Sequence, residues 1–420
     1  MSSAAQIEIA APARPGPRFV PAFLALFLLG SQLYLIATRD FTHLLENPFL
    51  PYCLLGAFAI HMAARPGRRE CVITLTLASL LGLGFMVLRP GFQWTWPNEL
   101  AAASSLGVAA LAVLSFHTAR LQGVEQRERM GTLIAGSVFI YTALFIAFVL
   151  KLTAALHPKT YDLYLYAADT GFGIPIAAQA ALFLARHSVL SSICEFVYES
   201  LPLAVSLLYA YEKGGRRPLV TRVLPAFLGG GAAAYLLYNF MPAAGPLYVF
   251  GAQFPQHLPK TVPLALEAPL IAGAPRNAVP SMHLACALLI FWNVRRLAHW
   301  AYLASALYLG FTVMATLGFG EHYVVDLVAG VPYALFLGAV CANKSSKNTP
   351  EQRRAMVTGL ALTVVWMLTL RFEPLVFQWP ALTWPAVTAT IATCWIAQRR
   401  FERVRQDASI RDAEPQATRT

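Results

Sequence analysis

Two histidines, 39 residues apart, have the type and setting that could do chemistry in this chain. His283 follows Pro280 and Ser281, and His322 follows a glycine-rich turn, each directly before an apolar stretch. A membrane-spanning helix needs roughly 20 residues at about 1.5 Å each, so one helical hairpin returns the chain to the face it left. We therefore expect both histidines on one membrane face, at the same depth.

A carboxylate accompanies the second histidine. Asp326 lies four residues after His322, which places both side chains on one face of a helix. Such a carboxylate can hold one ring nitrogen, fix the tautomer and leave the other nitrogen nucleophilic. The free N–H groups and positive dipole at this helix start favour a phosphate. Ser281 can cap the first helix, and Arg276 before it is a candidate oxyanion clamp.

Simpler interpretations compete with this one. A lone histidine at a helix end is usually structural, and we interpret the other seven histidines that way. An acid just inside a membrane boundary is costly without a partner, and His322 is the obvious partner for Asp326. Two histidines and an aspartate could also ligate zinc, but no His-Glu-x-x-His motif or cysteine ligand accompanies them. We therefore predict neither a metal nor another cofactor.

The composition is that of an integral membrane protein, with 57% hydrophobic and 13% charged residues. Backbone polar groups in lipid must be satisfied within each segment, so the fold class is all-α. We predict a polytopic membrane protein of about 12 transmembrane helices with a six-helix core. The predicted spans are 19–37, 48–64, 71–89, 100–118, 132–156, 191–212, 219–240, 280–297, 299–318, 322–341, 354–371 and 381–398.

The net charge of +11 is distributed as in a membrane protein and does not indicate a nucleic-acid partner. With both termini in the cytoplasm, all but eight of the 32 lysines and arginines lie on that side, as the positive-inside rule requires. We expect a bacterial inner membrane, with both histidines on the periplasmic side and basic tails against anionic lipid. The eight lysines and arginines that do not lie on the cytoplasmic side are Arg39, Arg89, Lys151, Lys159, Arg186, Lys260, Arg276 and Arg371.

The oligomeric state is not predicted.

The chain is predicted to have five parts. Residues 172–187 could span, but counting them would invert every preceding loop, so we interpret them as an interfacial helix. The long Pro- and Gly-rich loop 241–279 ends at the first histidine motif and is expected to fold over the site. The parts are a disordered cytoplasmic N-terminus 1–17, a four-helix extension 18–120, a catalytic membrane domain 130–343, a two-helix extension 352–398 and a basic cytoplasmic tail 399–420.

These motifs resemble the type 2 phosphatidic acid phosphatase superfamily, most closely its branch containing inositol phosphorylceramide synthase. The resemblance rests on Asn-Ala-Val-Pro-Ser-Met-His at 277–283 and Gly-Glu-His-Tyr-Val-Val-Asp at 320–326. Residues 238–246 and 161–171 also resemble upstream elements of that branch. The likeness covers about residues 130–343.

The resemblance implies a mechanism. His322 would attack phosphorus, Asp326 would orient it, and His283 would protonate the leaving oxygen. Water or an alcohol would then take the phosphoryl group from the phosphohistidine, with His283 as base. The substrates would be membrane lipids in the bilayer, and the candidate phosphate- and substrate-binding residues are Arg276, Asn277, Ser281, Tyr238, Tyr323 and Lys260.

Departures from the phosphatase pattern favour a transferase. The loop lacks a Lys-x6-Arg-Pro motif, Ala315 and Thr316 stand where Ser-Arg would, and Met282 replaces a glycine. Fewer cations suit a phosphodiester. We expect transfer of a phosphorylated headgroup to a lipid alcohol such as a ceramide or diacylglycerol; the alternative is hydrolysis of a lipid phosphate or polyprenyl diphosphate. A twelve-span transporter is a distant alternative, and a polyprenyl-linked glycosyltransferase would need more acids than Asp40 and Glu46 in the first outer loop.

Overall fold

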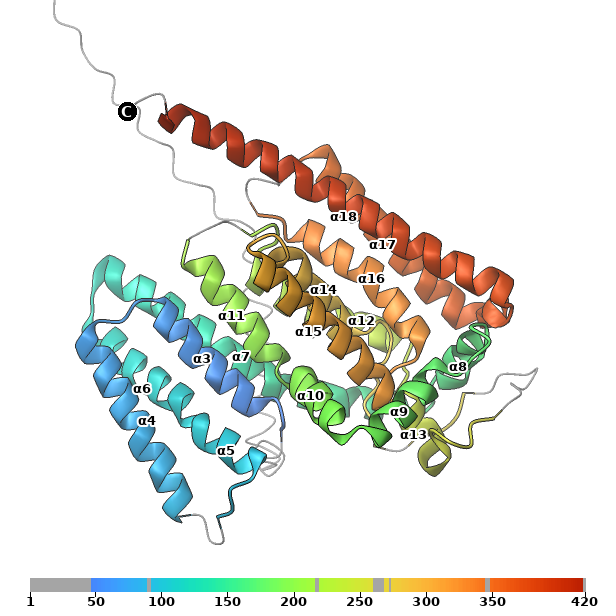
Figure 1. Cartoon of the computed structure of the whole chain (residues 1–420), viewed down its shortest axis with the longest axis horizontal. Helices are drawn as coiled ribbons and strands as arrows, with labels where there is room; N and C mark the ends of the chain where they lie inside the picture. The colour runs from blue at the N-terminus through green and yellow to red at the C-terminus, as the bar shows by residue number, and fades with distance from the viewer. Residues whose placement is uncertain are drawn as a thin grey trace, which may run out of the picture. The chain divides into compact units, whose positions relative to one another are not determined.

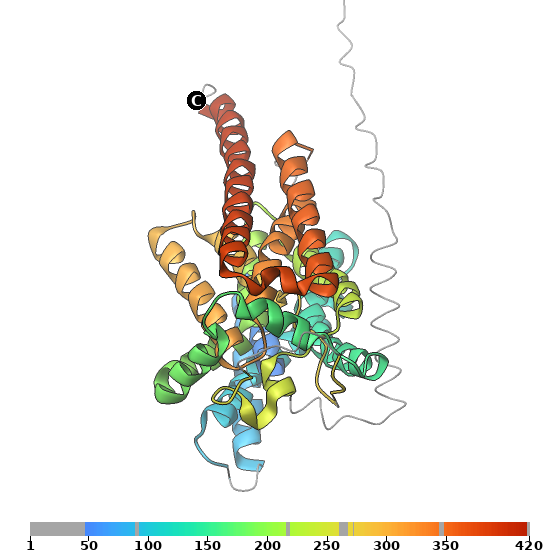
Figure 2. The same ribbon diagram turned by 90° about the vertical axis from the view of Figure 1, so that its right-hand side faces the viewer.

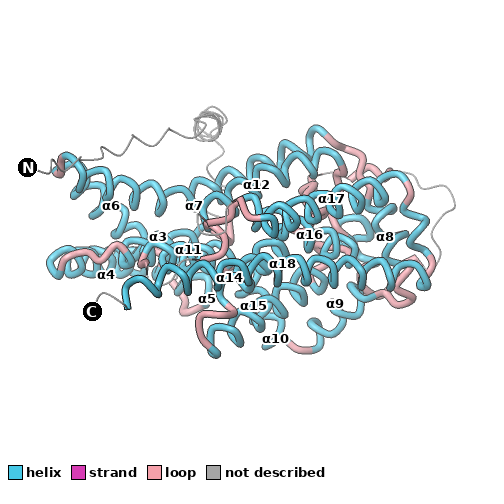
Figure 3. Tube along the Cα trace, turned by 90° about the horizontal axis from the view of Figure 1, so that it is seen from above, coloured by secondary structure: helices cyan, strands magenta, loops and turns pink. Residues whose placement is uncertain are grey.

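The computed structural model describes residues 47–417 except 89–91, 216–218, 260–267, 272 and 344–347. Within these residues the regular elements are helices, joined by loops and two isolated β-bridges (Figure 3). The predicted all-α class therefore holds for the described part of the chain. The predicted span 19–37 lies outside the described residues, and so does Lys260.

Each predicted span from residue 48 onward lies mainly in helix, and the spans 100–118 and 191–212 are each divided between two helices (Figure 1). The N-terminal helices are α3 (Leu50–Ala63), α4 (Arg68–Leu88), α5 (Trp96–Ala103), α6 (Ser105–Arg120) and α7 (Gly123–Leu156). The middle helices are α8 (Asp162–Thr170), α9 (Ile176–Arg186), α10 (Ser188–Glu199), α11 (Leu201–Lys213), α12 (Val223–Phe240) and α13 (Pro246–Phe250). The last are α14 (Met282–Val294), α15 (His299–Gly318), α16 (Val324–Val340), α17 (Pro350–Phe372) and α18 (Pro380–Ala417).

Six described helices are long and apolar enough to cross a membrane, or seven if the bent pair α9–α10 counts as one span. This is consistent with an integral membrane protein, although the predicted count of 12 spans is not confirmed. The helices that begin at the histidine motifs are shorter, with 13 residues in α14 and 17 in α16. At about 1.5 Å per residue they reach less than the roughly 30 Å of a hydrocarbon core, because loops replace their outer turns.

Two predicted segments have a different geometry. The apolar segment 172–187 forms α9, which bends by 117° into α10, so the pair is a broken span or a re-entrant element. The predicted span 191–212 is divided between α10 and α11 at Ser200. Pro202 is the second residue of α11, and proline suits the first turn of a new helix better than the interior of a continuing one.

Helix α16 packs against α12, α14, α17 and α18 (Figure 1). Helices α17 and α18 lie side by side (Figures 1 and 2). The Tyr333 hydroxyl of α16 donates a hydrogen bond to the Gly230 carbonyl oxygen of α12 at 2.6 Å. Helix α14 contacts α15 and α11, and α3 from the N-terminal part packs on α11. Helices outside the histidine hairpin therefore pack on both of its histidine helices, α11 on α14 and α12, α17 and α18 on α16.

Candidate active site

The two histidine motifs meet where α14 and α16 begin. The Ser281 N–H donates to the Asp326 carbonyl oxygen at 3.1 Å, and the Ser281 Oγ accepts from the Leu284 N–H at 3.4 Å as the cap of α14. The helices approach closely here, because a methyl group on Gly330 would lie 2.9 Å from the Ser281 carbonyl oxygen. The predicted capping role of Ser281 is confirmed.

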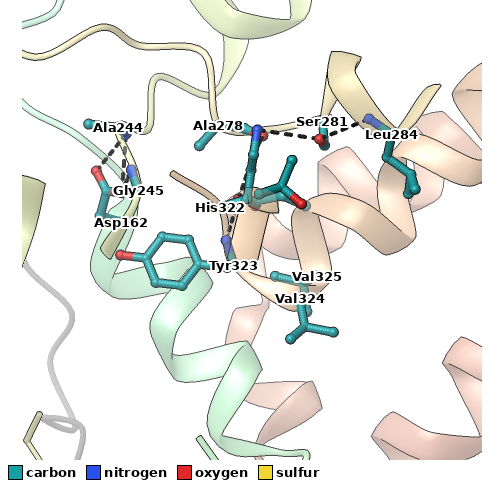
Figure 4. A network of polar contacts seen from close by, with 12 residues as sticks. Asp162, Ala244, Gly245, Ala278, Ser281, Leu284, His322, Tyr323, Val324 and Val325 are labelled. Atoms are coloured by element: carbon teal, nitrogen blue, oxygen red, sulfur yellow. Dashed lines mark hydrogen bonds and ion pairs between the residues drawn. The ribbon is translucent and has the colours of Figure 1, made fainter. Parts of the chain in front are cut away.

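His322 is held in one tautomer by a backbone carbonyl. Its Nδ1 lies 2.8 Å from the Ala278 carbonyl oxygen and 3.5 Å from Asp326 Oδ2. Because a carbonyl oxygen only accepts, Nδ1 carries the proton and Nε2 keeps its lone pair. Nε2 lies 3.3 Å from Ser281 Oγ (Figure 4). Nε2, which keeps its lone pair, is therefore the ring nitrogen that can act as a nucleophile.

Asp326 has a second task besides facing His322. Its Oδ2 accepts a hydrogen bond from the Tyr323 N–H at 2.8 Å, within the first turn of α16. Asp326 is fully buried. It therefore supports the imidazole from one side, while the shorter contact comes from Ala278.

His283 faces His322 across a small gap and is backed by aromatic rings. The centroids of the two imidazoles are 6.5 Å apart, with their planes at 66°. One face of His283 stacks on Tyr198 of α10, with centroids 3.9 Å apart and planes at 15°. Phe49, which precedes α3, lies 6.1 Å from the same imidazole. The predicted N-terminal extension thus supplies part of the wall beside His283.

The N-terminus of α16 is occupied by Asp169. Its Oδ2 accepts from the Val324 N–H at 2.9 Å and its Oδ1 from the Val325 N–H at 3.0 Å. Together with the bond from Tyr323 to Asp326, these contacts use the N–H groups that we expected to receive a phosphate. That expectation is corrected: carboxylates of the protein already cap this helix, and burial raises the pKa of Asp169 to about 8.

The N-terminus of α14 keeps its donors. The N–H groups of Met282 and His283 make no hydrogen bond within the described part of the chain, because Pro280 and Ser281 precede them and the first helical N–H groups have no intrahelical acceptor. Both groups belong to the first turn of the helix that carries His283. This helix start, rather than that of α16, can present N–H groups to an anion.

Asp162 fixes a second loop of the site. It is buried and accepts hydrogen bonds from the N–H groups of Ala244 (3.0 Å) and Gly245 (2.8 Å) (Figure 4). Gly245 has a φ of 105°, and a methyl group there would lie 2.4 Å from the Glu321 carbonyl oxygen. Burial raises the pKa of Asp162 to about 6. The loop from α12 is therefore clamped against the turn that carries His322.

This loop also positions Ala278. The Ala278 N–H donates to the Ala243 carbonyl oxygen at 3.0 Å, while its own carbonyl oxygen accepts from His322. Sequence reasoning missed this carbonyl, because its role does not depend on the side chain. It also assigned no role in the site to Asp162 or Asp169, although two acids seven residues apart in an apolar segment were a signal that could have identified them.

Arg276 is fully buried and bonded to its own loop. Its Nε donates to the His157 carbonyl oxygen at 2.9 Å, Nη1 to that of Ala274 at 2.6 Å, and Nη2 to that of Ile271 at 2.5 Å. The guanidinium thus joins the loop that precedes the first histidine motif to the end of α7. Its predicted phosphate contact stays a prediction.

The other predicted binding residues lie around the same loops. Tyr323 and Tyr238 are buried, with exposed fractions of 1% and 8%, and Asn277 is half-buried. The described part of loop 241–279 contacts the His322 turn, since the Tyr248 hydroxyl donates to Glu321 Oε1 at 3.1 Å. Burial raises the pKa of Glu321. The substrate-binding roles of these residues stay predictions.

A model of the PAP2 superfamily matches residues 163–340 of this chain. The match includes both histidine motifs, Asp169 and Asp326, and it supports the superfamily that these motifs resemble. Members of this superfamily are phosphatases and phosphotransferases, which supports an enzyme. No curated protein and no solved structure matches the chain. The inositol phosphorylceramide synthase-like branch stays a prediction.

Proposed function

We propose that this protein is a membrane lipid phosphotransferase that uses His322 as its nucleophile. It transfers a phosphorylated headgroup to a lipid alcohol at the outer membrane face. The observation that carries the proposal is the tautomer of His322: Nδ1 donates to the Ala278 carbonyl oxygen, so Nε2, which lies 3.3 Å from the Ser281 hydroxyl, keeps its lone pair, and the ring of His283 lies 6.5 Å away.

In the first step, His322 Nε2 attacks phosphorus of the donor lipid. A bond forms between nitrogen and phosphorus, the ester bond to the leaving oxygen breaks, and protonated His283 gives its proton to that oxygen. Reacting atoms at about 3–3.5 Å fit between rings whose centroids are 6.5 Å apart. The positive charge that develops on His322 is stabilised by Asp326 Oδ2, 3.5 Å from Nδ1.

Donors near the start of α14 would stabilise the phosphoryl oxygens. The candidate donors are the N–H groups of Met282 and His283 in the first turn of α14 and the Ser281 hydroxyl, which lies 3.3 Å from Nε2 of His322; their interactions would strengthen as negative charge grows in the transition state. This donor set carries no full positive charge of its own. It therefore suits a phosphodiester monoanion better than a phosphomonoester dianion.

In the second step, an alcohol attacks the phosphohistidine. His283, now neutral, accepts the alcohol proton, the nitrogen–phosphorus bond breaks, and His322 is released. The surroundings favour a lipid alcohol over water: His322 is only 2% exposed, and Tyr198 and Phe49 form an apolar wall beside His283. Helices long enough to span a bilayer support access for such an acceptor from the membrane.

The reaction is tested with full-length protein in lipid nanodiscs in the presence of a chelator. Labelled phosphatidylinositol, phosphatidylglycerol, phosphatidic acid or polyprenyl diphosphate is supplied with and without ceramide or diacylglycerol, and the phosphorus is followed. We expect a new phospholipid only when an acceptor is present. Free phosphate or free headgroup phosphate without an acceptor would instead identify a hydrolase with the same site.

Three variants accompany this assay. His322→Ala and His283→Ala should abolish turnover, whereas His299→Ala, an exposed histidine at the start of α15, should leave it unchanged. Turnover that survives the loss of His322 would overturn the assignment of the nucleophile.

A further inference from the structure

A second polar pocket lies outside the histidine site. It has a volume of about 310 Å³ and opens where α7, α12 and α17 end. None of the groups assigned to catalysis lines it. The lining residues are Leu156, His157, Pro158, Lys159, Tyr161, Asn239, Pro242, Ala268 and Arg371.

Arg371 is held in this pocket as an oriented cation. Its guanidinium lies 4.5 Å from the ring centroid of Tyr161 and 4.8 Å from that of Phe240, and its Nη1 donates to the Phe240 carbonyl oxygen. Within the described residues no carboxylate pairs with it. A guanidinium fixed by aromatic faces keeps its remaining N–H groups in a defined direction, which suits a phosphate.

Lys159 adds a second positive charge. Its side chain is exposed and makes no hydrogen bond or ion pair in the described part of the chain, and the pocket lining contains no aspartate or glutamate. Two cations without a lining anion make the pocket attractive to a negatively charged group.

His157 and Asn239 complete the polar wall. The His157 Nε2 lies 2.9 Å from Asn239 Oδ1, and Asn239 Nδ2 donates to the Tyr235 carbonyl oxygen at 2.8 Å. The amide oxygen therefore accepts, and Nε2 of His157 donates. This pair fixes the imidazole, which is a further polar group in the pocket.

Exposed apolar side chains lie near the ends of the three helices that border the pocket. Leu156 at the end of α7, Leu236 of α12 and Phe372 of α17 expose 56%, 70% and 62% of their surface. Exposed apolar residues on three helix ends are expected where lipid tails cover a membrane protein. The pocket therefore lies where apolar helix surfaces meet polar loops, which is the level of lipid headgroups.

We infer that this pocket binds the headgroup phosphate of an anionic phospholipid, through Arg371 and Lys159. The site is separate from the gap between His283 and His322. It is nevertheless tied to the catalytic loop, because the His157 carbonyl oxygen accepts from Arg276 Nε and the Thr160 N–H donates to the Pro269 carbonyl oxygen.

The test compares lipid retention by full-length protein from nanodiscs that contain equal amounts of phosphatidylglycerol and phosphatidylcholine, read by native mass spectrometry. The wild type should retain phosphatidylglycerol preferentially. Lys159→Gln should reduce that preference about fivefold, the value of one cation near a membrane surface. Arg371→Gln should do the same, and Arg186→Gln, an exposed arginine at the end of α9, should have no effect.

Lys159→Gln is the decisive variant, since its side chain makes no bond that the fold needs. An unchanged preference in Lys159→Gln would overturn the site. Inorganic phosphate and glycerol phosphate are added as competitors: little displacement by them supports a lipid ligand. Displacement of the bound lipid by either at low millimolar concentration would overturn the lipid assignment and identify a site for soluble phosphate.

Discussion

Asp169 Oδ2 accepts a hydrogen bond from the Val324 N–H at 2.9 Å, so an acid of α8 caps the helix that begins two residues after His322. The bond joins positions 155 residues apart. The other carboxylate oxygen of Asp169 accepts a second hydrogen bond, from the Val325 N–H. The start of α16, and with it the placement of the proposed nucleophile, therefore depends on a residue far away in the chain.

Asp169→Asn should reduce turnover more than substrate binding. An amide can accept only one of the two N–H bonds, and its NH2 group would face the other donor. A shift of about 1 Å at a reacting group can cost about 100-fold in rate. Steady-state kinetics in nanodiscs should show kcat falling roughly 10- to 100-fold with KM little changed. A normal kcat in a folded variant would contradict the positioning role of Asp169.

The same carboxyl should make stability depend on pH. Burial raises the pKa of Asp169 to about 8, from about 3.9 in an unfolded chain. The folded state therefore binds the proton more tightly, so this contribution is fully present below about pH 4 and is lost as the pH rises to about 8.

Thermal unfolding in detergent checks this sign. Between pH 5 and pH 8 the wild type should lose more stability than Asp169→Asn, which has no proton to release at this position. Equal losses in the two proteins would show that Asp169 does not titrate in this range.

Gly330→Ala should separate the two histidine motifs. The added methyl group would lie 2.9 Å from the Ser281 carbonyl oxygen, so the start of α14 must move away from α16. Overpacking of this kind costs about 1–3 kcal/mol. Turnover and the unfolding temperature should both fall. Gly310→Ala in α15 is the matched control, because nothing lies within 4 Å of its added methyl group.

The Tyr198 ring should matter for His283 through its face and not its hydroxyl. Its stack on His283 has centroids 3.9 Å apart, and aromatic pairs contribute about 0.5–1.5 kcal/mol. Tyr198→Phe should therefore keep wild-type transfer, and Tyr198→Ala should lower kcat about tenfold. A large loss in Tyr198→Phe would assign the hydroxyl a role in the reaction.

The sequence was sufficient for the parts of the site that depend on local spacing. The spacing of four from His322 to Asp326 places both on one face of a helix, and a proline and a serine before His283 are typical of a helix start. The carbonyl of Ala278 and the carboxylate of Asp169 were not predictable, because their roles arise from tertiary contacts with residues far along the chain.

Tertiary structure also decides where the helices bend and break, which the sequence pattern did not predict. Hydropathy identifies apolar segments but not their direction, so the 117° bend between α9 and α10 and the break at Ser200 had no counterpart in the apolar pattern. Phe49 and Tyr198 look like ordinary membrane-facing aromatics in sequence. Only the fold shows that they approach His283.

The most direct test of the account is to trap the covalent intermediate. Full-length protein is mixed with donor lipid labelled at phosphorus, without acceptor, quenched under alkaline conditions that preserve a nitrogen–phosphorus bond, and digested for mass spectrometry. The account predicts label on the peptide that contains His322, absent in His322→Ala and formed in the wild type without added metal. Label on another residue, or turnover with no label on the protein, would contradict it.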